Sequence, residues 1–414
     1  MAPEAQLAVI DLANTGTGIY VPNTYDLFAP AYNAGARAQC HSWGGRFSSN
    51  NPDNQYAFGE PVDDWLYRHQ DAVVVYSAGN MGQEGQYSLT REATIKNAIS
   101  VGAADSTAVQ KVAFFSSQGP TYDGRIKPDI VAAGHWTTSA KAAADGNEQC
   151  DTHAMAGTSM SAPAITGAAL LIRQYFKSWK FWKSMCNTDY DNCDKWTPSG
   201  VLIKAIILHA GRPMEQYNGI NSDSRYELGP TPDSVQGYGF MDLSTTLMIR
   251  EDLRVRFSDA DDDETLPPQQ DLFVVNAEQI GEDTVFTYHI HCEDPEVPLR
   301  TTLAWYDPPV PGKPSKALLH DLDLMLETPG GKIMHGNGGD DEDDVNVNEQ
   351  VRVDDPERGT YIVTVTSHSL PVGEHTQRFS LVITVGGYTE PMGSTETTET
   401  PATLPVPIYD SILP

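Results

Sequence analysis

The sequence of 414 residues holds no apolar run of the length that a membrane-spanning helix requires, and it contains no segment with the pattern of a signal peptide. Basic residues are also scarce: 27 Lys and Arg stand against 56 Asp and Glu, for a net charge of −29 at pH 7. This deficit argues against nucleic acid as a partner, because a phosphate backbone is bound through Lys and Arg. The acidic balance suits a secreted, extracellular or vacuolar protein, or one that binds cations, although a well-solvated surface alone would carry the same charge.

Cysteine is rare and its number is odd, so the chain cannot form a complete disulfide framework within itself. The five cysteines are Cys40, Cys150, Cys186, Cys193 and Cys292. Cys186 and Cys193 flank a polar loop and could pair, whereas Cys40 lies in an expected strand and should be a small buried side chain. The cysteines therefore leave the redox compartment undecided.

Strand and helix signals alternate from residue 1 to about residue 250. Strand-like apolar runs occupy residues 6–11, 38–43, 72–77 and 98–103, and helical spacing occupies residues 24–34, 62–70, 159–176 and 199–210. This alternation predicts βαβ units and a parallel sheet with helices on both faces. Functional groups in such sheets gather beyond the carboxyl ends of the strands, and Asn80 closely follows the run over residues 72–77.

The composition changes between residues 259 and 270, where an acidic run is followed by Pro267 and Pro268. We interpret this segment as a domain boundary. From residue 271 to residue 387 short alternating segments recur between turn residues, which predicts an antiparallel β-sandwich or jelly roll. The Thr- and Pro-rich end favours a disordered tail. The predicted domains are thus residues 1–250, 265–388 and 389–414.

The most specific segment is Gly157-Thr158-Ser159-Met160-Ser161-Ala162-Pro163, at the start of an expected helix. A serine in the first helical turn lies where unpaired backbone N–H groups and the positive end of the helix dipole converge. Those groups stabilise the anion that forms when a hydroxyl attacks a carbonyl. A plain helix cap uses the same residue types, so the alternative interpretation of Ser159 is an N-cap.

This heptapeptide resembles the serine motif of the subtilisin-like serine proteases, in which the first serine is the nucleophile, and the match falls on Ser159. The segment Ser77-Ala78-Gly79-Asn80 resembles the oxyanion-hole motif of that family and implies this role for Asn80. Further similar segments follow in the family's order: Met1–Ala5, Asn33–Trp43, Phe115–Pro120 and Gly124–Gly134, although the family usually has proline where Ala133 stands.

The resemblance extends from residue 1 to residue 387 and is greatest to the branch with a C-terminal β-domain. It implies an α/β fold, an incomplete subtilisin-like parallel sheet, followed by an all-β sandwich. The implied activity is that of a serine-type endopeptidase, which cleaves polypeptide substrates through an acyl-enzyme. We expect such a chain to be a monomer.

A substrate groove follows from the same resemblance. In the family an extended peptide lies between two segments beside the nucleophile, and these match Ser42-Trp43-Gly44 and Ser77-Ala78-Gly79. Such a peptide binds as an added strand, with main-chain hydrogen bonds for affinity and a side-chain pocket for preference. The alternative is that these glycines, and Asn80 after them, only shape turns.

Two parts of this machinery have no counterpart in the sequence. A serine hydroxyl needs a general base, and that base needs an orienting carboxylate. The family supplies them in His-Gly-Thr and Asp-Thr/Ser-Gly motifs, and neither motif occurs in residues 1–414. His153 lies nearest to Ser159 in the sequence, but we expect it to be structural, like His41, His69 and His135.

We therefore expect the sequence to begin inside the catalytic domain, as a fragment or from a misplaced start, and to be inactive by itself. The alternative is a pseudoprotease that binds peptides without cutting them. An upstream, in-frame extension of the transcript carrying both motifs would favour the first interpretation over the second.

The second predicted domain carries oxygen-rich segments. Asp321 and Asp323 alternate with leucines, so both carboxylates should face one side of a strand. A second acidic run begins at Asp340, after a glycine-rich loop. We expect Asp321, Asp323 and Asp340 to bind a structural Ca²⁺, which takes about six to eight oxygen ligands, and a solvated acidic loop is the alternative. Trp305 and Tyr306 could stack on a sugar or pack inside the domain.

If these carboxylates bind calcium, millimolar Ca²⁺ should raise the melting temperature, because an ion that binds only the folded state stabilises it. Thermal unfolding with calcium chloride and with a chelator measures this effect. Identical melting temperatures in the two solutions would rule out a stabilising calcium site.

Overall fold

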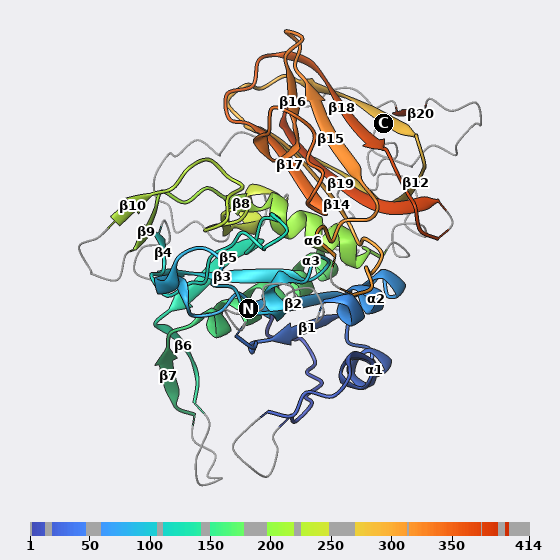
Figure 1. The fold of residues 1–414 in the computed structure, drawn as a ribbon. Helices are drawn as coiled ribbons and strands as arrows, with labels where there is room; N and C mark the ends of the chain where they lie inside the picture. The colour runs from blue at the N-terminus through green and yellow to red at the C-terminus, as the bar shows by residue number, and fades with distance from the viewer. Residues whose placement is uncertain are drawn as a thin grey trace. The chain divides into compact units, whose positions relative to one another are not determined.

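The computed structural model describes residues 2–12, 19–46, 59–105, 111–141, 150–177, 197–218, 225–247, 270–312, 314–373, 375–387 and 394–396. The chain divides into two compact units (Figure 1). The first comprises Met1–Leu170, Gly211–Met241 and Pro309–Ala317, and the second comprises Leu171–Ala210, Asp242–Pro308 and Leu318–Pro414. Cys186 and Cys193, whose pairing was open, lie outside the described residues.

Four parallel strands form the centre of the sheet in the first unit (Figure 1). β1 (Ala38–His41) pairs with β2 (Val73–Ser77), β2 pairs with β3 (Ile99–Asp105), and β3 pairs with β5 (Ile130–His135). Every residue of β2 is buried, as are all but the last residue of β3, which explains why both are continuous apolar runs. The predicted α/β class is therefore confirmed.

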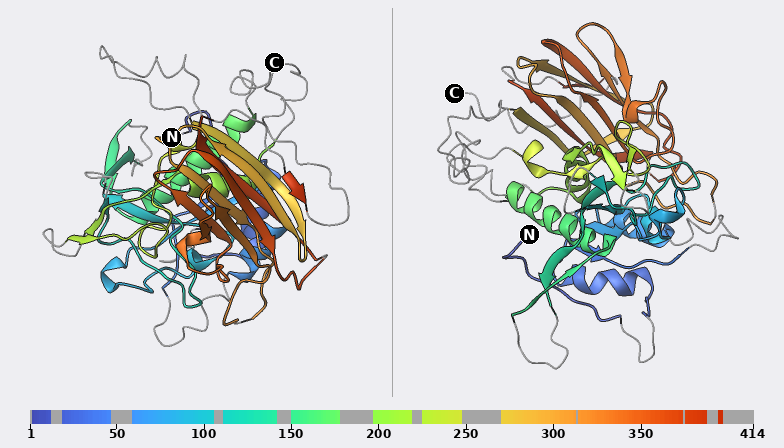
Figure 2. Two further views of the ribbon diagram at one scale, coloured as in Figure 1. Left: turned by 90° about the horizontal axis from the view of Figure 1, so that it is seen from above. Right: turned by 90° about the vertical axis from the view of Figure 1, so that its left-hand side faces the viewer.

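Shorter strands extend this sheet and make it mixed. Next to β3 come β4 (Lys111–Val112), β9 (Gln216–Asn218) and β10 (Arg225–Glu227), and next to β5 come β11 (Phe240–Met241) and β8 (Gly211–Arg212). A separate antiparallel hairpin consists of β6 (Thr137–Ala140) and β7 (Thr152–Met155). Figures 1 and 2 show this hairpin extending away from the sheet.

The helices begin where the sequence places caps and prolines. α1 (Thr24–Asn33) follows Asn23, whose side chain accepts a hydrogen bond from Asp26 N (3.0 Å), and α2 (Glu60–Arg68) has proline in its first turn. α3 (Thr158–Lys177) and α6 (Gly200–His209) follow, with short 3₁₀ turns η3 (Gly82–Glu84), η4 (Glu92–Thr94) and η5 (Leu243–Thr245). Among the helices in the described ranges, none is both long and apolar enough to cross a membrane.

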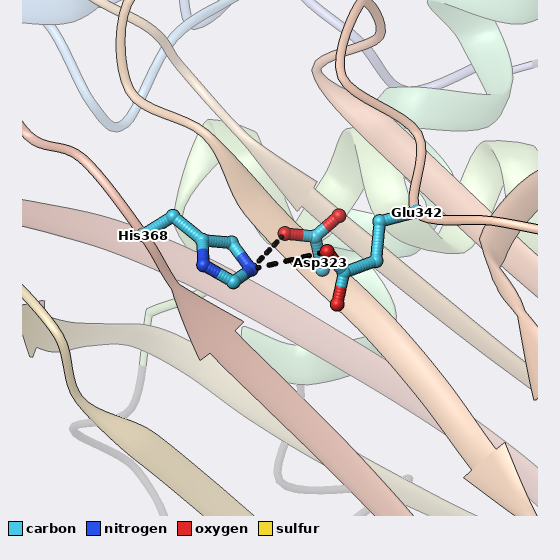
Figure 3. A group of neighbouring side chains, drawn as sticks. All are labelled: Asp323, Glu342 and His368. Atoms are coloured by element: carbon cyan, nitrogen blue, oxygen red, sulfur yellow. Dashed lines mark ion pairs between the residues drawn. The ribbon is translucent and has the colours of Figure 1, made fainter.

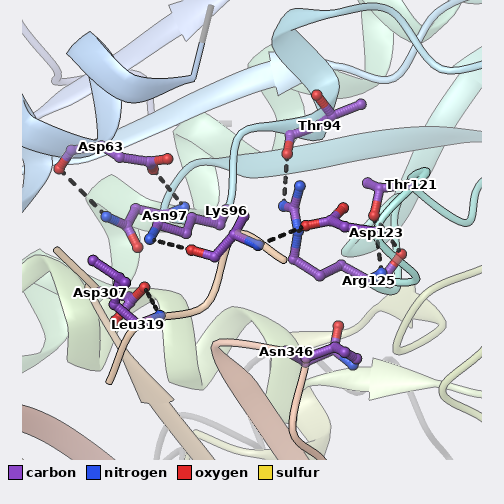
Figure 4. Close-up of polar contacts among 12 residues, drawn as sticks. Asp63, Thr94, Lys96, Asn97, Thr121, Asp123, Arg125, Asp307, Leu319 and Asn346 are labelled. Atoms are coloured by element: carbon purple, nitrogen blue, oxygen red, sulfur yellow. Dashed lines mark hydrogen bonds and ion pairs between the residues drawn. The ribbon is translucent and has the colours of Figure 1, made fainter. Parts of the chain in front are cut away.

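Buried polar side chains hold the loops of the first unit in place (Figure 4). Asp63 of α2 is fully buried, and its Oδ1 accepts a hydrogen bond from Asn97 N (2.9 Å), just before β3. Arg125 donates to the Thr94 carbonyl (2.7 Å) and to Asp123 Oδ2 (2.8 Å), just before β5. Because buried charges are costly unless they are paired, these partners define the loop conformations between the strands.

Two predictions for the first unit are wrong. Residues 6–11 form no strand, and Leu7 and Val9 are 87% and 84% exposed. An extended apolar segment becomes a strand only beside a hydrogen-bonded neighbour, and within the described residues no strand pairs with this one. Cys40 is exposed rather than buried, because side chains alternate along β1 and the buried side is occupied by Gln39 and His41.

The second unit is a sandwich of two mainly antiparallel sheets (Figure 2). One sheet has the order β12 (Gln270–Gly281), β19 (Thr376–Gly386), β14 (Leu299–Trp305) and β17 (Asn348–Val353). The other has the order β16 (Ile333–His335), β15 (Leu322–Glu327), β18 (Gly359–Ser367), β13 (Val285–Cys292) and β20 (Ser394–Glu396), with the turn η6 (Gly336–Gly338) after β16. The predicted all-β region is confirmed.

Apolar side chains from both sheets fill the sandwich. Phe286 of β13 and Phe379 of β19 meet across it with ring centroids 5.8 Å apart. Trp305 and Tyr306 are fully buried, and the Trp305 indole N–H donates to the His320 carbonyl (3.0 Å). Of the two alternatives for these aromatic residues, packing inside the domain is confirmed, and a buried ring offers no face on which a sugar could stack.

His209, at the end of α6, is fully buried, and its ring contacts two hydroxyl groups. Its ring nitrogens lie 2.9 Å from Thr302 Oγ1 and 2.9 Å from Thr384 Oγ1. Burial, together with the positive charges of Arg300 and Arg352, lowers the pKa of His209 well below its ordinary value. The folded protein therefore holds this imidazole in its neutral form.

We predict that His209 makes the fold sensitive to acid. In the unfolded chain a histidine gains a proton below about pH 6.5, whereas the folded state keeps His209 neutral, so unfolding takes up a proton. Each further pH unit below about 6.5 should lower the free energy of unfolding by about 1.4 kcal/mol. Urea unfolding of His209→Gln should show a lower stability at alkaline pH but a shallower loss toward acid. His153→Gln, an exposed position in β7, is the control and should keep the wild-type slope; equal slopes in all three proteins would contradict the prediction.

Candidate active site

Ser159 is the second residue of α3, and its neighbours determine how the helix begins. Pro163 has no N–H, so the Ser159 carbonyl, four residues earlier, lacks its helical partner. The Ser42 hydroxyl donates a hydrogen bond to this carbonyl (2.9 Å). In return the Ser159 hydroxyl donates to the Ser42 carbonyl (3.1 Å). The two serines are joined in both directions, so Ser159 Oγ lies against the loop that leaves β1.

Asn80 follows the carboxyl end of β2, and its amide oxygen accepts two hydrogen bonds from Thr158. One comes from the backbone N–H (2.9 Å) and the other from the hydroxyl (3.1 Å). A backbone N–H can only donate, so it identifies the amide oxygen at this position and directs Nδ2 the other way. Asn80 is exposed, and its Nδ2 donor makes no hydrogen bond within the part of the chain that the structure describes.

Thr158 also joins a third residue to this arrangement. Its hydroxyl accepts a hydrogen bond from Gly79 N (3.1 Å) while it donates to Asn80, and its side chain is fully buried. Gly79 has a φ of +115°, and a Cβ there would lie 2.7 Å from Ser117 Oγ. Gly157 has a φ of +152° and donates its N–H to the Gly134 carbonyl (2.8 Å) at the end of β5. Both glycines are therefore required by backbone conformation.

The sequence assigned no role to Thr158, although it lies inside the heptapeptide that marked Ser159. Its role depends on a partner that is 78 positions away in the chain. The signal that was available is its place directly before the nucleophile candidate, at the first residue of α3.

The two segments that are predicted to bind substrate differ in whether their main-chain groups are free to pair with a peptide. Ser77, Ala78 and Gly79 are buried, and the main-chain N–H and C=O groups of Ala78 and Gly79 are all hydrogen-bonded to residues within the unit. Trp43 is half-buried and Gly44 is exposed, and the main-chain groups of both make no hydrogen bond to any described residue. Main-chain pairing with a peptide is therefore open at Trp43 and Gly44, while the other segment can only form a wall. Substrate contact by either segment stays a prediction.

None of the histidines in the described ranges reaches Ser159 Oγ. His41 is buried among aromatic rings, stacked on Tyr76 at 4.8 Å, and its burial lowers its pKa to about 4. His69 Nδ1 lies 2.7 Å from the Trp65 carbonyl, and His135 Nδ1 lies 3.3 Å from Asp105 Oδ1. His153 is exposed in β7, opposite Ser139.

The predicted metal ligands of the second unit lie in different surroundings. Asp321 is half-buried before β15, Asp323 is buried in β15, and Asp340 is exposed in the loop before β17. The structure places Asp323 beside Glu342 and His368 instead. Glu342 belongs to the acidic run that begins at Asp340, whereas the sequence did not single out His368. Burial, followed by the charges of Asp321 and Glu342, raises the pKa of Asp323 to about 7. Calcium binding by Asp321, Asp323 and Asp340 stays a prediction.

Comparison with known proteins identifies a family. A sequence profile described as the Subtilase family matches residues 1–239. Two proteins of Dictyostelium discoideum described as serine protease/ABC transporter B family proteins are similar over most of this chain. The one called tagD is 25% identical over 444 residues, covering 82% of this chain and 24% of tagD. The one called tagB is 23% identical over 513 residues, covering 92% of this chain and 25% of tagB.

A shorter similarity connects the chain to bacterial proteins. The serine protease AprX of Bacillus subtilis is 35% identical over 115 residues, which are 25% of this chain and 26% of AprX. This chain thus spans about a quarter of the length of the Dictyostelium relatives that it matches.

We predict that the Thr158 hydroxyl is a stabilising cross-link of the site. Thr158→Val keeps the shape of the side chain but leaves the buried Gly79 N–H without an acceptor, so the free energy of unfolding should fall by about 1–3 kcal/mol. Thr166→Val, in the same helix, is the control, because its hydroxyl bonds only to the Ala162 carbonyl of its own helix (3.0 Å). Denaturant unfolding measures both, and an equal, small effect of the two substitutions would show that Thr158 has no special role.

Proposed function

This chain belongs to the subtilase family of serine proteases, and we propose that Ser159 is its nucleophile and Asn80 its oxyanion donor. The substrates are extended polypeptides, which are cleaved through an acyl-enzyme. One observation carries the proposal: Thr158 and Ser42 hold Asn80 and the Ser159 hydroxyl at the same end of the parallel sheet.

The chemistry proceeds in two halves. Ser159 Oγ forms a bond to the carbonyl carbon of the substrate while its proton passes to a general base, and the carbonyl electron pair moves onto oxygen. The oxyanion then collapses, the C–N bond breaks, and the base returns the proton to the leaving amine. Water attacks the acyl-enzyme in the same way, which releases the new carboxyl terminus and restores the serine hydroxyl.

Two donors support the oxyanion in this proposal. The backbone N–H of Ser159 belongs to the first turn of α3, where N–H groups have no helical acceptor, and the helix dipole adds a partial positive charge. The second donor is Asn80 Nδ2, which is directed by the two hydrogen bonds on the amide oxygen. Donors held in position before the reaction stabilise the developing charge without reorganisation.

The substrate strand is proposed to pair with the loop after β1. The free main-chain groups of Trp43 and Gly44 lie directly beyond Ser42, whose carbonyl contacts the nucleophile. An extended peptide that pairs with them passes its backbone across Ser159. The buried wall formed by Ser77, Ala78 and Gly79 then limits the size of the side chain that enters beside it.

The proposal depends on a general base, which neither a His-Gly-Thr motif nor a histidine in the described ranges supplies. The assay therefore uses the whole protein that contains this sequence, whatever its length. We predict that Ser159→Ala abolishes both hydrolysis of quenched fluorescent peptides and covalent labelling by a fluorophosphonate. Asn80→Ala should lower kcat by about 10²–10³, the range known for loss of one oxyanion donor in a subtilisin.

Ser161→Ala is the matched control, because Ser161 lies in the same helix turn, is fully buried, and should leave kcat within a few-fold of the wild type. Activity retained in Ser159→Ala would refute the nucleophile assignment. If the wild type binds extended peptides but neither cleaves them nor reacts with the probe, the non-catalytic alternative replaces the protease.

A further inference from the structure

Three side chains of metal-ligand type meet in the second unit, outside the chemistry proposed for Ser159 (Figure 3). His368 Nε2 lies 2.9 Å from Asp323 Oδ2 and 3.5 Å from Glu342 Oε2. One ligand atom from each residue lies within 4.8 Å of those from the other two. Asp323 belongs to β15, Glu342 to the loop before β17, and His368 follows β18, so three separate segments converge here.

These separations match the spacing of ligands around a small divalent ion. Two atoms that each lie about 2.0–2.1 Å from Zn²⁺ are about 2.9 Å apart at a right angle and about 3.4 Å apart at a tetrahedral angle. The two distances from His368 Nε2, 2.9 and 3.5 Å, lie at these values. Both carboxylates therefore lie close enough to His368 Nε2 to share one ion with it.

Buried carboxylate oxygens beside the cluster provide a second, independent indication. Asp323 is 5% exposed, and its Oδ1 has no hydrogen-bond partner among the residues that the structure describes. Glu349 is fully buried, and its Oε2 accepts a hydrogen bond from Leu324 N (2.8 Å), next to Asp323. Its Oε1 has no partner within the described ranges of the chain. A buried carboxylate oxygen that accepts no hydrogen bond is costly, and a cation held by Asp323 would offset that cost.

Neighbouring carboxylates also act on Glu349. Burial, followed by the negative charges of Asp343 and Asp323, raises the pKa of Glu349 well above that of an ordinary carboxyl. Asp343 itself is held by the side-chain amides of Asn337 and Asn346. Several carboxyl groups therefore lie close enough to Asp323 and Glu349 to act on their charge.

The imidazole of His368 indicates which class of metal ion this cluster would bind. Ca²⁺ is held by oxygen ligands, about six to eight of them, whereas a histidine nitrogen with carboxylates suits Zn²⁺. We propose that Asp323, Glu342 and His368 form a structural Zn²⁺ site of the β-sandwich. The ion would connect β15, the acidic loop before β17 and the segment after β18, and would balance the buried carboxylates. A simple surface ion pair of His368 with two carboxylates is the alternative.

We predict that the chain binds one Zn²⁺ at this site and that Zn²⁺ raises its melting temperature, because the ion binds only the folded arrangement. Calorimetric titration with zinc chloride measures the stoichiometry and Kd, and thermal unfolding with zinc, with calcium and with a chelator measures the stabilisation. His368→Ala and Glu342→Gln should each weaken zinc binding by at least about tenfold. Both residues are largely exposed, so neither variant should prevent folding.

His291→Ala is the matched control, because His291 forms a similar exposed pair with Glu293 (3.1 Å) in the same unit, and it should bind zinc like the wild type. Ser159→Ala should also bind zinc normally, which separates this result from the protease proposal. The assignment is overturned if the wild type binds no zinc, or if His368→Ala binds zinc with unchanged affinity. Tighter binding of calcium than of zinc would also overturn it and would favour the oxygen-only site expected from the sequence.

Discussion

The hydrogen bonds of Thr158 hold together two segments that are far apart in the chain, and the geometry of the candidate active site depends on them. Through its backbone N–H and hydroxyl, this residue orients the Asn80 amide, and through the same hydroxyl it binds the Gly79 N–H. It is also the first residue of α3, so it sets where the helix begins and where Ser159 stands. A fully buried side chain with two such hydrogen bonds, beside a third from its own backbone, has little freedom to move. Thr158 therefore positions both the proposed nucleophile and the proposed oxyanion donor.

The parallel sheet makes this arrangement possible. β1 and β2 run in the same direction, so Ser42 and Asn80 both leave the sheet at the carboxyl ends of strands, where groups from different strands can meet. Gly134 in β5 approaches from the same sheet and accepts the Gly157 N–H. Pro163 then leaves the Ser159 carbonyl open for Ser42, which couples the start of α3 to the loop after β1. The start of α3, the parallel order of the strands and the contact with Ser42 together place Ser159 at the carboxyl end of the sheet.

In the β-sandwich, His209, Asp323 and Glu349 are buried polar side chains. Most of the interior of the sandwich is apolar, with Phe286 and Phe379 in contact across the two sheets. His209 is accommodated because two threonine hydroxyls face its ring nitrogens. Asp323 and Glu349 are accommodated less completely, since each has a buried oxygen without a hydrogen-bond partner. A divalent ion between Asp323, Glu342 and His368 would complete this otherwise unbalanced region.

The sequence by itself determined the classes of the elements, because their patterns are local. The buried runs at β2 and β3, the helix beginning at the GTSMSAP segment and the alternating strands of the sandwich were all predicted from residues that lie next to one another, and Ser159 and Asn80 were singled out from short motifs. Only the tertiary structure decided what depends on a distant neighbour. The apolar residues 6–11 pair with no strand in the part of the chain that the structure describes, and Cys40 lies on the exposed side of β1. The contact partners of Thr158, and the meeting of Glu342 and His368 with Asp323, follow from how separate segments pack together, which no local pattern encodes.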